Sequence, residues 1–375
     1  MLKRDISLFL MLYKICSYMA ITPLNFPKIL GTSGKYYPLL VFFLFLSATV
    51  YSIIEKKNIF STHDKLTYII TDRLVCIFDM LFISTCTIGS IKHSKNWKLF
   101  FDVLKELERK LNGTDFQPYQ NVFVSSLLLL MVHVLFIFVH FFENYIWVRN
   151  DDLEIVYPYI TGRLVMYYQI WSATLICYIT NIFRRRYAFL NRHILTVVNC
   201  KWNVLHNKKL NVYERLAEVR DIYAGIYDVI EHFNAIFGGQ IFLILLNSGL
   251  QILNTINFAL YGKDASSKTA KDFNMMYLVI YSLLAGFVVM SCDMVKKSGA
   301  KVTHTCYFLQ KGMLTSPLKK ELLYLGTFTK ELNPKFSAAG YFEVKQSVLA
   351  ALFSTVATHL IICIQFNMSN SMSNQ

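Results

Sequence analysis

The stretch Ser347–Phe366 reads SVLAALFSTVATHLIICIQF and contains no Asp, Glu, Lys or Arg. A bilayer core about 30 Å thick is crossed by about 20 apolar residues in a helix that rises about 1.5 Å per residue. The stretch has that length, and it therefore predicts a membrane-spanning helix. Other segments of the chain come close to the same criterion of about 20 apolar residues with few charges.

Six further segments are predicted to cross the membrane. Segment 66–91 carries Asp72, Arg73 and Asp79, but only Asp79 falls within its apolar core over 74–91. The chain is 54% hydrophobic and 17% charged, whereas soluble domains have about 45–50% apolar and about 25% charged residues. We therefore expect an all-α integral membrane protein with seven transmembrane helices: 36–54, 66–91, 121–142, 164–183, 233–260, 275–292 and 347–366.

The positions of the basic residues predict the orientation. The segments 1–35, 92–120, 184–232 and 293–346 together hold 29 Lys and Arg, whereas the segments on the other side, ending with 367–375, hold 7. The positive-inside rule places the richer side in the cytoplasm. The N-terminus is then inside and the C-terminus outside, opposite to a G-protein-coupled receptor. The net charge of +14 is assigned to loops that face anionic lipid, and nucleic-acid binding is rejected.

Three smaller features complete the outline. Ile6–Tyr13 predicts a short helix at the membrane surface, and 184–232 a long cytoplasmic loop. The eight cysteines fall in spans or cytoplasmic segments, where disulfides do not persist. No nucleotide-binding, hydrolase or zinc-protease motif is present. We expect neither an enzyme nor a resident metal or cofactor.

Two histidines share one face of the third predicted span. His133 and His140 are seven residues apart, a spacing that brings them to the same side of a helix. They could bind a metal if a third ligand lay nearby. Packing, or hydrogen bonding to a neighbouring helix, is the preferred interpretation.

The last span carries a polar stripe. Small and hydroxylated residues, followed by isoleucines and an amide, fall within about 60° of one direction on the helix. The stripe is Ser347, Ala351, Ser354, Thr358, Ile361, Ile362 and Gln365. It predicts either a close helix–helix contact or a surface that lines water, because an apolar ring beside a polar ring is the arrangement of a dewetting gate.

The end of this span resembles a family signature. Thr358-His359-Leu360-Ile361-Ile362-Cys363-Ile364-Gln365-Phe366 resembles the Thr-Tyr-(five apolar)-Gln-Phe motif of insect gustatory receptors. Gly340-Tyr341-Phe342 resembles the Gly-Phe-Phe segment that precedes it in that family. The chain departs from the motif at His359, which replaces the tyrosine and is expected to face a neighbouring helix.

The resemblance implies a ligand-gated, non-selective cation channel of the plasma membrane, related to insect odorant receptors. It implies a tetramer, of this chain or with related receptors, in which the last span surrounds a central pore. Ile362 matches the hydrophobic gate of that family and Gln365 the adjacent polar ring. A helix from Pro317 to about Lys330 would belong to the cytoplasmic anchor that holds the tetramer.

The ligand is expected to be an extracellular tastant that binds within the outer part of each subunit. A bitter plant compound is the default and a sugar the alternative; a metabotropic receptor, a transporter or a lipid-modifying enzyme would be other classes. Asp72 or Asp79 could either contact the ligand or form a structural ion pair with Arg163. The candidate pocket residues are Tyr68, Asp72, His133, His140, Arg163, Tyr167, Gln169, Gln251, Asn254, Tyr277 and Tyr281.

Overall fold

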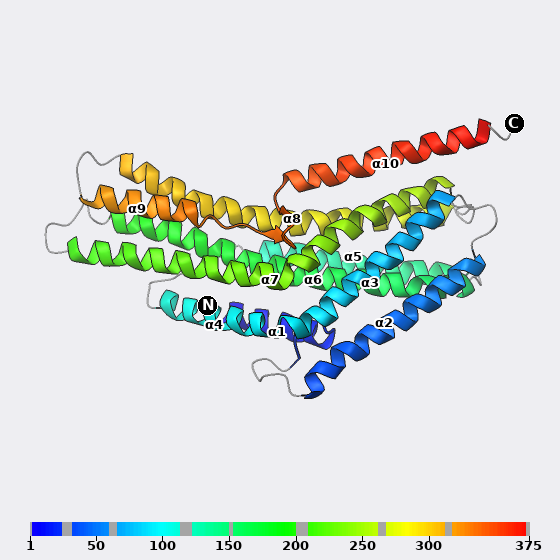
Figure 1. Ribbon diagram of the computed structural model, residues 1–375, viewed down its shortest axis with the longest axis horizontal. Coiled ribbons are helices and arrows are strands. Elements are labelled where there is room, and N and C mark those ends of the chain that lie inside the picture. Colours follow the sequence, from blue (N-terminus) through cyan, green and yellow to red (C-terminus); the bar gives the residue numbers. More distant parts are fainter. Residues whose placement is uncertain are drawn as a thin grey trace.

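The computed structural model describes residues 2–24, 32–59, 66–112, 122–149, 153–199, 209–261, 268–311 and 317–372. This part of the chain is almost entirely helical (Figure 1), which confirms the predicted all-α class. Its elements are α1 (Leu2–Tyr18), α2 (Thr32–Ile59), α3 (Leu66–Lys92), α4 (Ser94–Asn112), α5 (Val122–Arg149), α6 (Leu153–Asn199), α7 (Lys209–Tyr261), α8 (Lys268–Lys311), α9 (Pro317–Glu331), β1 (Ser337–Ala338), β2 (Phe342–Glu343) and α10 (Ser347–Met372).

Four helices of the described part are long and apolar enough to cross a membrane. Their apolar stretches lie within Tyr36–Lys56, Tyr68–Lys92, Val212–Ala259 and Met275–Lys311. Helix α5 also exposes Val134, Ile137, Phe138 and Phe141 to its surroundings. A continuous apolar surface of this kind is unfavourable in water and suits contact with lipid.

Three helices continue well beyond any bilayer. Helices α6, α7 and α8 have 47, 53 and 44 residues, which corresponds to about 65–80 Å at about 1.5 Å per residue. In Figure 1 the C-terminal part of α6, the N-terminal part of α7 and the C-terminal part of α8 lie with α9 at one end of the molecule. Helices α2, α3 and α10 lie toward the other end. The segment 184–232, predicted to be a long cytoplasmic loop between two spans, is helical over 184–199 and 209–232, which continue α6 and begin α7.

The core near the middle of the bundle is aromatic. Ring centroids lie 5.4 Å apart between Trp97 and Phe237, 5.9 Å between Phe183 and Phe233, and 5.5 Å between Phe233 and Phe336. Tyr13 of α1 stands edge-on to Trp97 at 5.2 Å. Helix α1 therefore buries one face against α4 and α6, although the sequence predicted only a helix at the membrane surface.

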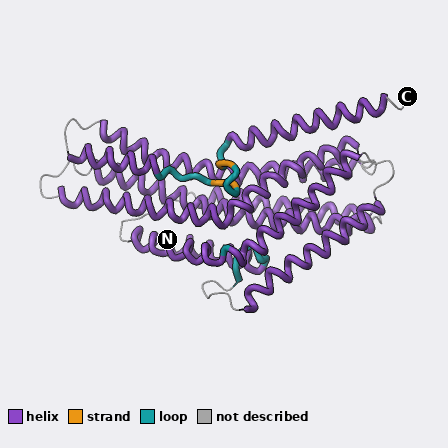
Figure 2. Tube along the Cα trace, in the orientation of Figure 1, coloured by secondary structure: helices purple, strands orange, loops and turns teal. Residues whose placement is uncertain are grey.

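A small hairpin connects the bundle to the last helix (Figure 2). Strands β1 and β2 pair antiparallel, with Ser337 opposite Glu343. The turn contains Ala339 and Gly340, both with positive φ, a conformation that glycine adopts without strain. The hairpin lies so close to α7 that a Cβ added at Gly238 would come within 3.0 Å of the Ser337 carbonyl oxygen.

Candidate functional site

A cavity of about 180 Å³ lies among α2, α3, α5, α6, α7 and α8. Seven of the eleven predicted pocket residues line it: Tyr68, Asp72, Arg163, Gln251, Asn254, Tyr277 and Tyr281. Lys56, Asp79, Glu143 and Tyr159 line it as well. An engineered cavity of about 150 Å³ holds benzene. The space is therefore suited to a molecule of about one ring.

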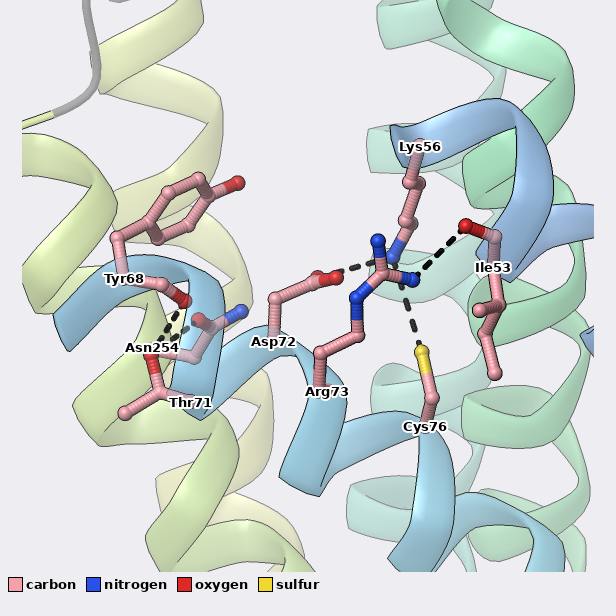
Figure 3. A network of polar contacts seen from close by, with 8 residues as sticks. All are labelled: Ile53, Lys56, Tyr68, Thr71, Asp72, Arg73, Cys76 and Asn254. Atoms are coloured by element: carbon pink, nitrogen blue, oxygen red, sulfur yellow. Dashed lines mark hydrogen bonds and ion pairs between the residues drawn. The ribbon is translucent and has the colours of Figure 1, made fainter. Parts of the chain in front are cut away.

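One wall of the cavity is an ion pair between α2 and α3 (Figure 3). Nζ of Lys56 lies 2.9 Å from Oδ1 of Asp72, and both side chains are buried. Lys56 also lies over the ring of Tyr159, 4.4 Å from its centroid. Next to this pair, Arg73 donates to the carbonyl oxygen of Ile53 at 2.9 Å. The basic side chains thus tie the end of α2 to α3.

The α3–α7 side of the cavity is held by a shorter polar chain. The Thr71 hydroxyl lies 2.9 Å from Oδ1 of Asn254 and 2.9 Å from the carbonyl oxygen of Tyr68 (Figure 3). The ring of Tyr68 stands 5.6 Å from that of Phe258. This side offers a ligand both amide atoms and aromatic faces.

Glu143 joins three helices that border the cavity. Nη2 of Arg163 donates to its Oε1 at 2.5 Å, and the Tyr277 hydroxyl donates to its Oε2. Nη1 of Arg163 donates to Oδ1 of Asn144 at 3.2 Å. Because Glu143 belongs to α5, Arg163 to α6 and Tyr277 to α8, a ligand that competes for this carboxylate would alter contacts among all three helices.

Asp79 is the second carboxylate of α3 that lines the cavity. Its side chain lies close to residues of α6 and α7. It is 4% exposed. Asn247 of α7 donates from Nδ2 to its Oδ1 at 2.6 Å. A Cβ added at Gly162 of α6 would lie 3.9 Å from its Oδ2. Within the described part of the chain, Asp79 has no ion-pair partner.

The alternative in which Asp72 or Asp79 forms an ion pair with Arg163 is wrong. Asp72 binds Lys56, Asp79 accepts from Asn247, and Arg163 binds Glu143. The sequence did not indicate Lys56 and Glu143 as partners, because both lie just past the predicted span ends at 54 and 142. The apolar criterion stops at the first charge, whereas α2 and α5 continue for another turn or more.

Four predicted pocket residues lie elsewhere. Nε2 of His133 lies 2.9 Å from the Thr174 hydroxyl of α6, and Nε2 of His140 accepts from Nδ2 of Asn144 at 3.2 Å. Tyr167 packs its ring 5.1 Å from Phe136. Gln169 is fully buried, and neither of its amide atoms has a partner among the described residues. These side chains belong to the packing around α6, outside the cavity lining.

Helix α10 forms the second candidate site. Its apolar residues Leu349, Leu352 and Val356 are half-buried against the bundle, and Leu352 and Val356 lie close to Gly249 of α7. The predicted polar stripe is exposed along its whole length within this chain: Ser347, Ala351, Ser354, Thr358, Ile361, Ile362 and Gln365. The stripe therefore makes no tight contact inside the described part of the subunit.

His359 and Phe366 belong to the family motif at the end of α10. His359 is exposed in this chain and donates from Nδ1 to the carbonyl oxygen of Thr355 at 3.1 Å. Its side chain thus bonds within α10. The side chain of Phe366 lies outside the described residues.

Comparison with known proteins identifies the fold class first. Two solved structures of the insect olfactory receptor OR5 from Machilis hrabei, one of them in complex with eugenol, are similar to this chain. Their TM-scores are 0.70 and 0.68, with 14% and 13% sequence identity, over 97% of this chain and 98% of theirs. No curated protein matches it in sequence. This chain therefore shares the fold of these olfactory receptor structures.

The family follows from the sequence match. The family model for 7tm chemosensory receptors matches residues 9–370. The chain belongs to this family.

Proposed function

We propose that this chain is an insect gustatory receptor that acts as a ligand-gated, non-selective cation channel in the plasma membrane. The observation that carries the proposal is the orientation of α10. Its apolar side packs on α7, and its polar stripe faces away from its own subunit. A stripe of this composition requires either water or a neighbouring helix, and a tetramer around a central pore would supply both.

Four copies of α10, from this chain alone or with related receptors, would place Ile362 and Gln365 around the conduction path. Ile362 would close the pore as an apolar ring, and Gln365 would contact permeating cations. Membership of a receptor family supports a role in signalling over one in catalysis. Seven spans belong to the same proposal and are supported by the apolar segments. A cytoplasmic N-terminus and an extracellular C-terminus are supported by the distribution of Lys and Arg.

A small extracellular molecule would open the channel by binding in the cavity among α2, α3, α5, α6, α7 and α8. The open and closed states need to differ in ligand affinity by a coupling free energy of about 1–3 kcal/mol. The Glu143–Arg163–Tyr277 cluster is well placed for this, since it links three helices that border the cavity. A bitter plant compound is the ligand class we favour, with a sugar as the alternative.

The decisive experiment is a current recording from cells that express this chain alone. Sugars and bitter plant compounds should include a ligand that evokes a cation current when G-protein signalling is blocked. Loss of the current under that block would favour a metabotropic receptor, and ligand uptake without current would favour a transporter. An epitope tag at each terminus, read with and without permeabilisation, tests the orientation in the same cells.

A further inference from the structure

Five acidic or basic side chains line the cavity, and acidic ones outnumber basic ones by one. The carboxylates are Asp72, Asp79 and Glu143, and the cations are Lys56 and Arg163. Asp72 is paired with Lys56 and Glu143 with Arg163. These pairings leave Asp79 as the lining carboxylate without an ion-pair partner in the described part of the chain.

A buried carboxylate without a counter-charge is costly. Removing an ion from water carries a large penalty that hydrogen bonds compensate only in part. Asp79 receives one hydrogen bond, from Asn247 to Oδ1. Its Oδ2 lies toward Gly162, whose missing side chain leaves room beside it. A cation that entered the cavity could approach this oxygen directly.

The surroundings of Asp79 favour an organic cation over a metal ion. Tyr277 and Tyr281 of α8 line the cavity with Val75 of α3 and Val165 and Met166 of α6. Aromatic rings attract ammonium groups through their faces, and the valines and methionine suit a hydrocarbon portion. The described residues contain no group of three His, Cys, Asp or Glu that could hold a metal.

We propose that the cavity binds small molecules of about one ring that carry a protonated amine, and that this ammonium group pairs with Asp79. The proposal rests on the proposed function in taking the cavity as the ligand site. It narrows the ligand class to organic amines, whereas a sugar would bind through hydrogen bonds and would gain little from an uncompensated charge.

The test measures binding to the purified full-length protein in detergent, without recording current. The probes are 2-phenylethylamine, cyclohexylamine and 3-methylbutylamine, each compared with the alcohol of the same carbon skeleton, and D-fructose as the sugar. We expect at least one amine to raise the melting temperature at a concentration about tenfold lower than its alcohol, because a charge-assisted hydrogen bond replaces a neutral one.

Two variants assign the effect to Asp79. Asp79→Asn should lower amine affinity about tenfold and leave alcohol affinity unchanged, and Asp79→Glu should retain the preference for the amine. The wild-type comparison holds even if Asp79→Asn does not fold. The proposal is overturned if no amine binds more tightly than its alcohol, if fructose binds more tightly than every amine, or if Asp79→Asn keeps the amine preference.

The binding assay and the current recording together distinguish a failure of this inference from a failure of the channel proposal. Amine binding that depends on Asp79, with no current evoked by any amine, bitter compound or sugar in cells that express this chain alone, would refute a channel formed by this chain alone and leave the inference standing. A current evoked by neutral ligands, with no effect of Asp79→Asn, would support the channel and refute the inference.

Discussion

Nζ of Lys56 on α2 lies 2.9 Å from Oδ1 of Asp72 on α3, and the two side chains are 7% and 3% exposed. The pair joins α2 and α3, which follow one another in the chain and pack together in the bundle. Each charge depends on the other, because neither is in contact with bulk water.

Removing one member of this pair should destabilise the protein strongly. Lys56→Met leaves the Asp72 carboxylate buried without its cation, which typically costs about 3–5 kcal/mol. The double variant Lys56→Met/Asp72→Leu should be closer to wild type than Lys56→Met, since no unpaired charge remains. Unfolding of the purified protein in detergent measures both. Independent, additive effects of the two substitutions would show that the pair is not coupled.

The contact between the hairpin and α7 should not tolerate a methyl group. Gly238→Ala would bring a Cβ to 3.0 Å from the Ser337 carbonyl oxygen and 3.1 Å from the Ala339 nitrogen. Overpacking against backbone typically costs about 1–3 kcal/mol. We expect a lower melting temperature and, because the hairpin leads into α10, an altered ligand concentration for half-maximal current.

Gly286→Ala is the matched control for this substitution. It also adds a methyl group to a helical glycine, but nothing lies within 4 Å of the added Cβ. The variant should be neutral, or more stable by up to about 1 kcal/mol, because alanine favours helix. Equal destabilisation by both substitutions would count against a special role for the hairpin contact.

Acid should weaken the part of the bundle that extends beyond the predicted membrane region. Burial of the His193 imidazole lowers its pKa; nearby Glu218 raises this pKa, and Arg215 lowers it. Below an ordinary histidine pKa of about 6.5 the unfolded chain binds a proton that the folded chain resists, so stability falls as the pH falls. His193→Gln should reduce the difference in melting temperature between pH 7.5 and pH 5.5, and an unchanged difference would assign the acid sensitivity to other groups.

Substitutions on the exposed stripe of α10 should change the current itself. Ile362→Ala removes apolar surface from the proposed gate, and a loss of about 1.4 kcal/mol in closed-state preference would multiply the unliganded open fraction about tenfold. Gln365→Ala should change conductance or cation selectivity. Ile364→Ala is the matched control, an isoleucine on the same helix but off the stripe. Currents unaffected by both Ile362→Ala and Gln365→Ala would refute the assignment of α10 to the pore.

Several features of the fold could be predicted from the sequence alone. The lack of charge over Ser347–Phe366 and similar segments predicted helices, because a backbone in lipid needs to satisfy its hydrogen bonds internally. The resemblance to insect gustatory receptors implied a helix from Pro317 to about Lys330, and α9 spans Pro317–Glu331. The helical period also separated Leu352 and Val356, which face α7, from the exposed stripe that contains Ser354 and Thr358.

The partners of the charged residues were decided only by the tertiary structure. Composition marked Asp72, Asp79 and Arg163 as unusual, but the rotation of each helix about its axis and the true ends of α2 and α5 determine which groups meet. Those quantities depend on packing between residues far apart in the chain: Asp79 and Asn247 are separated by 168 positions. The sequence therefore determined a membrane-embedded chemosensory receptor, whereas the three-dimensional packing decided that Asp72 pairs with Lys56 and that Asp79 lines the cavity without an ion-pair partner among the described residues.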